Sequence, residues 1–276
     1  MRLQRLSERL APFRLFVGAV TIVGACSVSP EQELAIGSAD AAQIDSELPL
    51  IQDSVVVGFI ATLGQSMAAR TSRADLKWRF AVVNSPEVNA FALPAGFIYV
   101  NRGAIEQAER LDQLAGIMGH EIGHVVRRHA VKQMEKVERG QVGLVVLCTL
   151  TRACSHVGGR VAIDVGAQAL KARYSQRDEA EADSEGVMNT LRVGIDPEGL
   201  PSFFEKLLET QSQHPTVVEA FFSTHPTDAA RVAATRREID AIPSQQRQNL
   251  VRDTPEFHAI QARVRALPLP PPSPPP

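Results

Sequence analysis

The stretch MGHEIGHVVRRHA, Met118 to Ala130, decides the fold and raises the question of function. It places three of the seven histidines of the chain within ten residues, with a glutamate between the first two. His120, Glu121 and His124 make the H-E-x-x-H pattern, in which positions i and i+4 share one face of a helix. Apolar residues recur at helical spacing from residue 111 to about residue 137, so we predict a long helix there.

Two imidazoles on one helical face can hold a single zinc ion, and Glu121 can lean over the open side of that ion as a general base. The alternative is a solvated helix that happens to be rich in histidine. Gly119 and Gly123 argue against it, since each costs a helix interior about 1 kcal/mol relative to alanine. Glycine at these positions indicates that another element approaches the helix closely.

The third ligand has to come from elsewhere in the chain. His129 lies five residues after His124, about 140° around the helix, so it is not a ligand on the same face, and we expect a supporting or packing role. Ala130 stands where metzincins carry their third histidine, which excludes that class. A helix over residues 175–192 offers Glu179 as a metal ligand and Asp183 as the acceptor that orients a ligand histidine. The alternative is a solvated acidic face.

The remaining pattern predicts an α+β fold that is mainly helical, zincin-like and of the gluzincin type. We predict helices over residues 48–70 and 200–211, and another that starts after His225 and runs through Arg236. Three short strands, at residues 78–83, 89–93 and 97–100, predict a small antiparallel sheet beside the metal-binding helix. The formal net charge of -2 gives no reason to expect nucleic-acid binding.

The N-terminal residues predict export. A basic start and an apolar run too short to cross a bilayer are typical of a signal peptide, here residues 1–25. The run ends in Val23-Gly24-Ala25-Cys26, which resembles the lipobox of bacterial lipoproteins. That resemblance implies lipidation of Cys26, a membrane anchor and a periplasmic location, and the following Ser27 favours the outer membrane. The alternative is a plain signal peptide with a cysteine there by chance.

We predict that residues 26–47 form a tether, 48–245 a zinc metallopeptidase domain, and 246–276 a C-terminal extension that ends in a disordered proline-rich tail. Cys148 and Cys154 remain after export. They form a disulfide or stay buried as thiols, and an exported chain favours the bridge.

Several blocks resemble one family in the same order. They are NAFALPAGFIYVNRG at 89–103, DQLAGIMGHEIGHVVRRHA at 112–130, YSQRDEAEADSEGV at 174–187 and STHPTDAAR at 223–231. Together they resemble the zinc metallopeptidases related to HtpX and the CaaX prenyl endopeptidase. Within that family the chain is most similar to the periplasmic lipoproteins resembling BepA and LoiP, with the mitochondrial Oma-type enzymes as cousins.

The resemblance implies a role for each matching residue. His120, His124 and Glu179 match the zinc ligands, Glu121 the base, and Asp183 the residue that orients a ligand histidine. His225 matches a histidine that either closes the site as a removable fourth ligand or assists catalysis as an electrophile. Arg231 matches an arginine near the active site and is a second candidate electrophile. The strand of Phe97, Ile98, Tyr99 and Val100 matches the edge along which substrate lies.

The expected activity is therefore zinc-dependent cleavage of unfolded or extended polypeptides in envelope protein quality control. Substrate added as a strand binds through its backbone, which favours unfolded chains over particular sequences. The alternative is a latent metallopeptidase fold that acts as a chaperone or adaptor. The helical-repeat segment of the BepA branch has no counterpart in these residues, so partners in outer-membrane assembly remain an open expectation.

Overall fold

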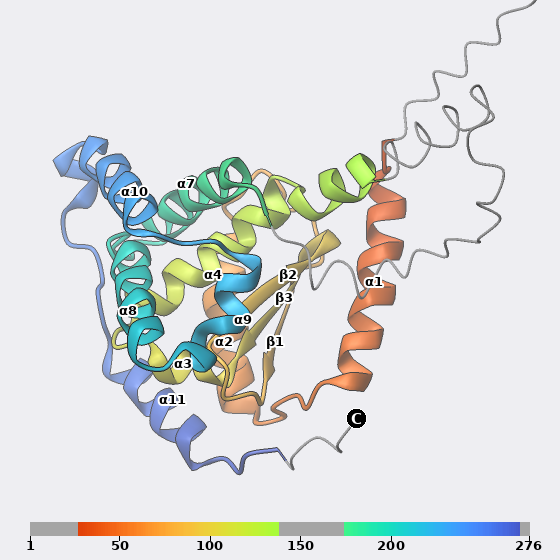
Figure 1. Cartoon of the computed structure of the whole chain (residues 1–276), viewed down its shortest axis with the longest axis horizontal. Coiled ribbons are helices and arrows are strands. Elements are labelled where there is room, and N and C mark those ends of the chain that lie inside the picture. Colours follow the sequence, from red (N-terminus) through yellow and green to blue (C-terminus); the bar gives the residue numbers. More distant parts are fainter. Residues whose placement is uncertain (1–26, 138–173, 271–276) are drawn as a thin grey trace, which may run out of the picture.

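The computed structural model describes residues 27–137 and 174–270. The predicted signal peptide, Cys26, Cys148, Cys154 and residues 271–276 lie outside these ranges. Helices make up most of the described chain (Figure 1). They are α1 (Pro30–Glu47), α2 (Ser54–Ala68), α3 (Arg102–Gln107), α4 (Leu111–Val126), α7 (Gln176–Arg192), α8 (Gly199–Gln213), α9 (Pro215–Thr224), α10 (Ala229–Ala241) and α11 (Pro255–Ala266), with 3-10 turns η1 (Pro94–Gly96) and η2 (Ser244–Arg247).

The sheet has three strands, β1 (Arg79–Val83), β2 (Ala90–Leu93) and β3 (Phe97–Asn101), in the order β1-β3-β2. β2 and β3 pair antiparallel through η1, whereas β1 and β3 pair parallel. The predicted α+β, mainly helical fold is confirmed, but the prediction of an antiparallel sheet is wrong for one of its two pairings. Chain direction alternates as in a meander, yet β3 inserts between the two earlier strands and so becomes the central one.

The two faces of the sheet contact different layers. Alternate residues such as Phe80, Val82 and Ile98 belong to the main core, which also contains buried residues of α2, α4, α8 and α11. The residues between them, including Ala81 and Tyr99, pack with Ala41 and Ile44 of α1 and with Leu93 in a second, smaller cluster. The sheet is therefore covered by α1 on one side and by the main helical body on the other, as Figure 1 shows.

Residues 30–47 form helix α1 and not the predicted tether. Ser29 caps the helix, and its side chain and that of Gln32 make a reciprocal capping box. Glu33 is buried and forms ion pairs with Arg73 at 2.7 Å and with Arg128 at 2.8 Å. The tether prediction is wrong here because the buried face of α1 includes Glu33, Gly37 and Asp40, which look like solvated residues in the sequence.

The described part of the predicted C-terminal extension contains a packed helix. α11 buries Phe257, Ile260 and Val264 in the main core and contacts α2 and α3. After the last residue of α11 the backbone passes Arg102, whose buried guanidinium donates a 2.9 Å hydrogen bond to the carbonyl of Leu267. The folded body therefore extends beyond residue 245 to the end of α11.

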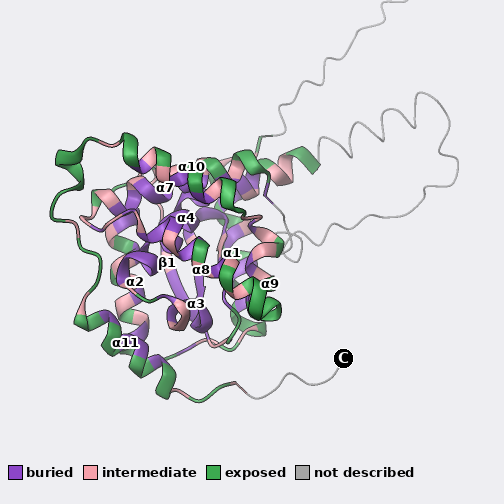
Figure 2. Cartoon of the chain, turned by 60° about the vertical axis from the view of Figure 1, so that its left-hand side comes forward, coloured by how far each residue is buried: buried purple, intermediate pink, exposed green. Residues whose placement is uncertain are grey.

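Burial singles out α4 as the central helix. Every residue from Leu111 to Val125 is buried, whereas α10 and α11 turn exposed faces outward (Figure 2). Across residues 27–137 and 174–270, no helix is both long enough and apolar enough to cross a bilayer. The predicted long helix of residues 111–137 is interrupted at Arg127 and Arg128, and Arg128 has a positive φ of 57°.

Candidate metal centre

Helix α7 lies against α4 and supplies the second half of the site. A Cβ atom added to Gly119 would lie 3.1 Å from the carbonyl oxygen of Gly186, and one added to Gly123 would lie 2.8 Å from Cβ of Glu185. These glycines allow the backbones of α4 and α7 to approach closely, as the sequence indicated. The close approach brings the start of α7, capped by Ser175, beside the two histidines of α4.

Four buried side chains direct one atom each toward a common point. They are His120 and His124 of α4, Glu179 of α7 and His225 at the end of α9, and their potential ligand atoms all lie within 4.8 Å of one another. The Nε2 atoms of His120 and His124 are 3.0 Å apart. Nδ1 of His225 is 3.3 Å from Nε2 of His120 and 3.0 Å from Oε1 of Glu179.

This arrangement fits a metal ion. Burial lowers the pKa of both His120 and His124, so their rings are neutral and present lone pairs. Lone pairs aimed at one point away from water are unfavourable unless a cation or proton lies between them. Imidazole nitrogens with one carboxylate oxygen form a donor set typical of catalytic zinc sites. The three predicted ligands are thus brought together, and His225 joins them.

Glu121 lies beside this group with its carboxylate buried. Its Oε1 has no hydrogen-bond partner and lies 3.4 Å from Nε2 of His225. Burial raises the pKa of Glu121 to about 7. A carboxylate whose pKa lies near neutrality is well suited to take up and release a proton at physiological pH.

Asp183 and Arg231 contact two of the ligand side chains, His120 and Glu179. Oδ1 of Asp183 is 2.9 Å from Nδ1 of His120, the ring nitrogen that faces away from the common point. Arg231 donates 2.7 Å hydrogen bonds to both carboxylate oxygens of Asp183, and another of its nitrogens lies 2.5 Å from Oε2 of Glu179. Burial alone would raise the pKa of Asp183, but the bonds from Arg231 and His120 lower it to about 2.

The role of Arg231 follows from these contacts. All its nitrogens point to Asp183, to Glu179, or to the carbonyl of Pro226 and the hydroxyl of Thr227. It therefore positions both carboxylates. Two carboxylates also determine the pKa of His225. Burial lowers that pKa, but the charges of Glu121 and Glu179 outweigh the effect of burial and leave the pKa raised.

Two residues contact His124 in ways that the sequence did not predict in detail. The ring of Tyr174 stacks on that of His124, with centroids 4.0 Å apart, and Nδ1 of His129 lies 2.9 Å from Nδ1 of His124. Helical spacing predicted only a supporting or packing role for His129, because no Gly or Pro marks the turn that brings its side chain back to His124. Glu181, which lies off the metal-facing side of α7, approaches His129 instead.

The predicted substrate edge must be corrected. Phe97, Ile98, Tyr99 and Val100 belong to β3, which is the central strand and is paired on both sides. The strand order cannot be read from local sequence, because the pairing of β1 with β3 spans almost twenty residues. The edge strand that contacts α4 is β2.

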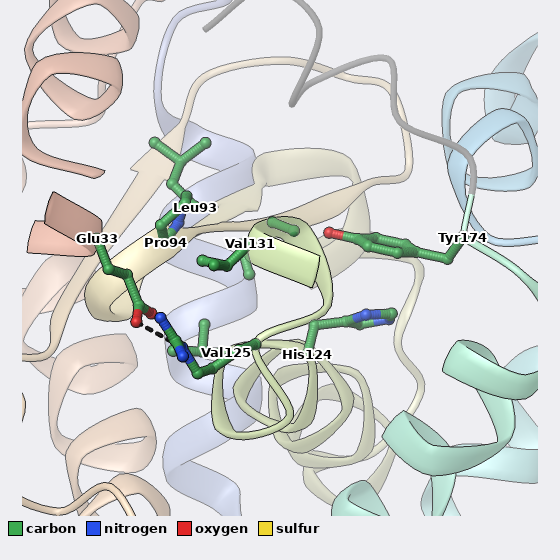
Figure 3. Close-up of a pocket in the computed structure, with 10 residues that line it drawn as sticks. Glu33, Leu93, Pro94, His124, Val125, Val131 and Tyr174 are labelled. Carbon is green, nitrogen blue, oxygen red and sulfur yellow. Dashed lines mark hydrogen bonds and ion pairs between the residues drawn. The ribbon is translucent and has the colours of Figure 1, made fainter. Parts of the chain in front are cut away.

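A pocket lies between β2 and the end of α4, next to His124 (Figure 3). Figure 3 shows Leu93 and Pro94 on one side, with Tyr174 and His124 on the other. Its walls are mainly apolar, and Glu33 and Arg128 also line it. The pocket therefore extends from the edge strand β2 to His124.

Comparison with known proteins agrees with this geometry. The family model described as "Peptidase family M48" matches residues 58–239. The chain is 28% identical over 251 residues to the beta-barrel assembly-enhancing protease of Escherichia coli (strain K12), covering 87% of this chain and 50% of that protein. The protein of the same name from Yersinia pestis is 31% identical over 240 residues, covering 85% and 49%.

A mitochondrial relative matches a smaller part of the chain. The chain is 30% identical over 173 residues to the metalloendopeptidase OMA1 of Bos taurus, covering 60% of this chain and 33% of that protein. The chain spans about half the length of the bacterial relatives and a third of the bovine one. The family match covers well over half of the 276 residues and includes all four side chains that converge at the candidate metal centre. The chain therefore belongs to peptidase family M48, a family of metallopeptidases.

Proposed function

We propose that the protein is a zinc-dependent endopeptidase that hydrolyses peptide bonds of unfolded or misassembled envelope proteins. The observation that carries the proposal is the convergence of His120, His124 and Glu179, with the buried carboxylate of Glu121 beside them. Family membership supports a metal-dependent peptidase. The donor set of two imidazoles and a carboxylate supports zinc as the ion.

His120, His124 and Glu179 would hold the ion. When bound, zinc supplies Lewis acidity that activates water and polarises the substrate carbonyl. Asp183 orients His120, and Arg231 fixes both Asp183 and Glu179, so the ligand side chains are placed before any ion arrives.

Glu121 acts as the general base and then as the acid. It accepts a proton from the attacking water and delivers it to the leaving amine, a role suited to its pKa of about 7. On this proposal Nε2 of His225, which lies 3.4 Å from Oε1 of Glu121, donates a hydrogen bond to the oxyanion that develops at the carbonyl.

Substrate would bind as an added strand on β2, the edge that contacts α4. Backbone hydrogen bonds to an edge strand require an extended segment, which unfolded polypeptides supply and compact domains do not. The mainly apolar pocket beside His124 would receive one small apolar side chain of the substrate. Because the substrate would bind mainly through its backbone, we expect the enzyme to accept many different substrate sequences.

The cellular setting is part of the proposal. The bacterial relatives carry the name beta-barrel assembly-enhancing protease, which supports misassembled outer-membrane proteins as proposed substrates and their assembly machinery as proposed partners. The lipobox-like sequence before Cys26 supports a lipid anchor, a periplasmic location and attachment to the outer membrane. Palmitate labelling of wild type and Cys26→Ala in cells tests the anchor, and equal labelling of both would contradict it.

The activity is tested with a chain that lacks residues 1–26 and so begins at Ser27. We expect about one zinc ion per chain and cleavage of unfolded casein. Glu121→Gln should keep the zinc and lower the cleavage rate by roughly 10²- to 10⁴-fold, the usual contribution of a general base. Equal cleavage by both proteins would show that Glu121 is not the base, and a wild-type chain without zinc would overturn the metal site.

The position of His225 favours a second candidate, a latent form of the same fold that acts as a chaperone or adaptor. Its ring lies within the ligand group, where it would occupy the open position that water needs. His225→Ala distinguishes the two. Faster casein cleavage by the variant supports latency, whereas slower cleavage assigns His225 to catalysis.

A further inference from the structure

The end of α4 turns back on itself at a residue with unusual geometry. Arg128 adopts a φ of 57°, which is uncommon for a residue other than glycine. Its guanidinium is held by Glu33 of α1 at 2.8 Å and by the carbonyl of Val28 at 2.7 Å. The chain therefore begins a new helical stretch at His129, and the side chain of His129 returns to the candidate metal centre.

His129 contacts His124 through a defined pair of atoms. Nε2 of His124 faces the common point, 3.0 Å from Nε2 of His120 and 3.6 Å from Oε1 of Glu179. Nδ1 of His124 is thus the ring nitrogen left over, and it lies 2.9 Å from Nδ1 of His129. Both rings are 98% buried.

A histidine that binds a metal through Nε2 carries its proton on Nδ1, and that N–H group almost always donates to a neighbouring acceptor. For His120 the group that faces Nδ1 is the carboxylate of Asp183, whose Oδ1 lies 2.9 Å away. In the part of the chain that the structure describes, His129 occupies the corresponding place for His124. It can accept through Nδ1 only if its own proton is on Nε2.

The groups that face Nε2 of His129 favour that tautomer. Its Nε2 lies 3.5 Å from Oε2 of Glu181 and 3.8 Å from Oδ1 of Asp178, both at the start of α7. Two carboxylates facing Nε2 stabilise a proton on that nitrogen and leave Nδ1 free to accept. The contacts form a continuous chain from the surface carboxylates through His129 to His124.

We propose that His129 is a positioning residue for the metal centre: its neutral ring accepts the Nδ1–H of His124 and thereby fixes the tautomer and orientation of that ligand. The inference rests on the proposed zinc site. The two ligand histidines would then have different neighbours at Nδ1, a charged aspartate for His120 and a neutral imidazole for His124. The stacked ring of Tyr174 restrains the same ligand from its face.

The test compares two substitutions of similar size in the full-length protein. In His129→Asn, the side-chain oxygen can take the place of Nδ1 and still accept the hydrogen bond. In His129→Leu, the volume is similar but no acceptor is left. The affinity for Zn²⁺ alone is measured by competition with a chromophoric chelator, and the melting temperature of each metal-free protein is measured alongside.

We expect His129→Leu to weaken zinc binding by about 10- to 100-fold, the usual effect of losing such a support. His129→Asn should retain most of the affinity, although both variants lose the same packing of the imidazole ring. Equal weakening in the two variants would reduce His129 to a packing residue, and unchanged affinity in His129→Leu would overturn the inference outright.

A measurement on the wild-type protein keeps the test independent of variant folding. Nitrogen-15 spectra of the zinc-loaded protein should show a slowly exchanging proton on Nδ1 of His124 and an unprotonated Nδ1 on His129. A proton on Nδ1 of His129 would contradict the inference while leaving the zinc site intact. A wild-type chain that binds no zinc would instead overturn the proposed function, and this inference with it.

Discussion

At the scale of single residues, the site depends on side chains that do not reach the metal position themselves. Asp183 bonds to a ligand histidine and to Arg231 at the same time, and Arg231 in turn contacts Glu179. One aspartate therefore orients ligands that come from two different helices. Loss of the charge of Asp183 would therefore weaken the positioning of both ligands.

For Asp183→Asn we predict a decrease in zinc affinity of about 10- to 100-fold. The new amide group would present N–H donors to Arg231, which is itself a donor, so the guanidinium would lose a bond that it now makes. Chelator competition measures the effect. Glu185→Gln is the matched control on the same helix, because its ion pair is with Arg127, which is 45% exposed, and such pairs contribute little. Equal affinities for the two variants would refute the prediction.

Residue spacing predicted part of this site and missed the rest. His120 and His124 lie four residues apart, as do Glu179 and Asp183, so helix geometry alone brings each pair to one face, with Glu121 next to the first pair. The contact of His129 depends on the turn at Arg128, whose side chain is held by Glu33 of α1 and by the carbonyl of Val28, and no local pattern records those tertiary contacts. Arg231 was expected near the site only because the family has an arginine there.

At the scale of elements, α1 is the main surprise. Its buried face begins with acidic and small residues, Glu33, Gly37 and Asp40, and has an apolar side chain of size only at Ile44, so periodicity predicted no helix there. The helix is nevertheless fixed by the ion pairs of Glu33 and by close backbone contact with η1. The order of the strands was also unpredictable, because pairing across the sheet is not encoded locally.

Gly37→Ala should detach α1 from the body. A Cβ atom at this position would lie 2.1 Å from the carbonyl oxygen of Pro94, a backbone atom that cannot move away alone. We expect faster proteolysis within residues 30–47 and a lower melting temperature. Gly58→Ala is the control, since its Cβ would meet nothing within 4 Å and alanine favours a helix by up to about 1 kcal/mol. Equal protease resistance in both variants would contradict the packing described for α1.

Glu33→Gln should change how stability depends on pH. Burial tends to raise the pKa of Glu33, but the bond from Arg73 and the charges of Arg73 and Arg128 outweigh it and lower that pKa. A lowered pKa in the folded state means that the carboxylate stabilises the fold above its unfolded pKa. That contribution is lost as the pH falls through the folded pKa.

Urea unfolding at several pH values measures this effect. We expect Glu33→Gln to reduce the free energy of unfolding by roughly 1–3 kcal/mol at pH 7, and the difference from wild type to shrink below about pH 4. Glu47→Gln, an exposed change at the other end of α1, serves as the control. A difference from wild type that stays constant across the whole pH range would show that the charge of Glu33 is not responsible.

At the scale of the whole molecule, the folded body reaches beyond the predicted metallopeptidase domain at both ends. α1 covers one face of the sheet and α11 completes the main core. We predict that Phe257→Ala, a truncation of a fully buried ring in α11, costs about 3–5 kcal/mol of stability. Glu256→Ala, the exposed neighbour, should change stability by less than about 0.5 kcal/mol. Similar melting temperatures for the two variants would show that α11 is not part of the core.

The N-terminal boundary of this body has a consequence for where the protein can work. Val28 is already fixed, since its N–H donates a 2.8 Å hydrogen bond to Glu135 and its carbonyl accepts one from Arg128. On the proposal that Cys26 carries a lipid, only Ser27 separates the anchor from the rigid protein, and one residue spans about 3.5 Å. A link of one residue allows the folded protein to move very little away from its lipid anchor. The candidate metal centre would therefore stay near the membrane surface, and the substrates that it reaches would be polypeptides close to that surface.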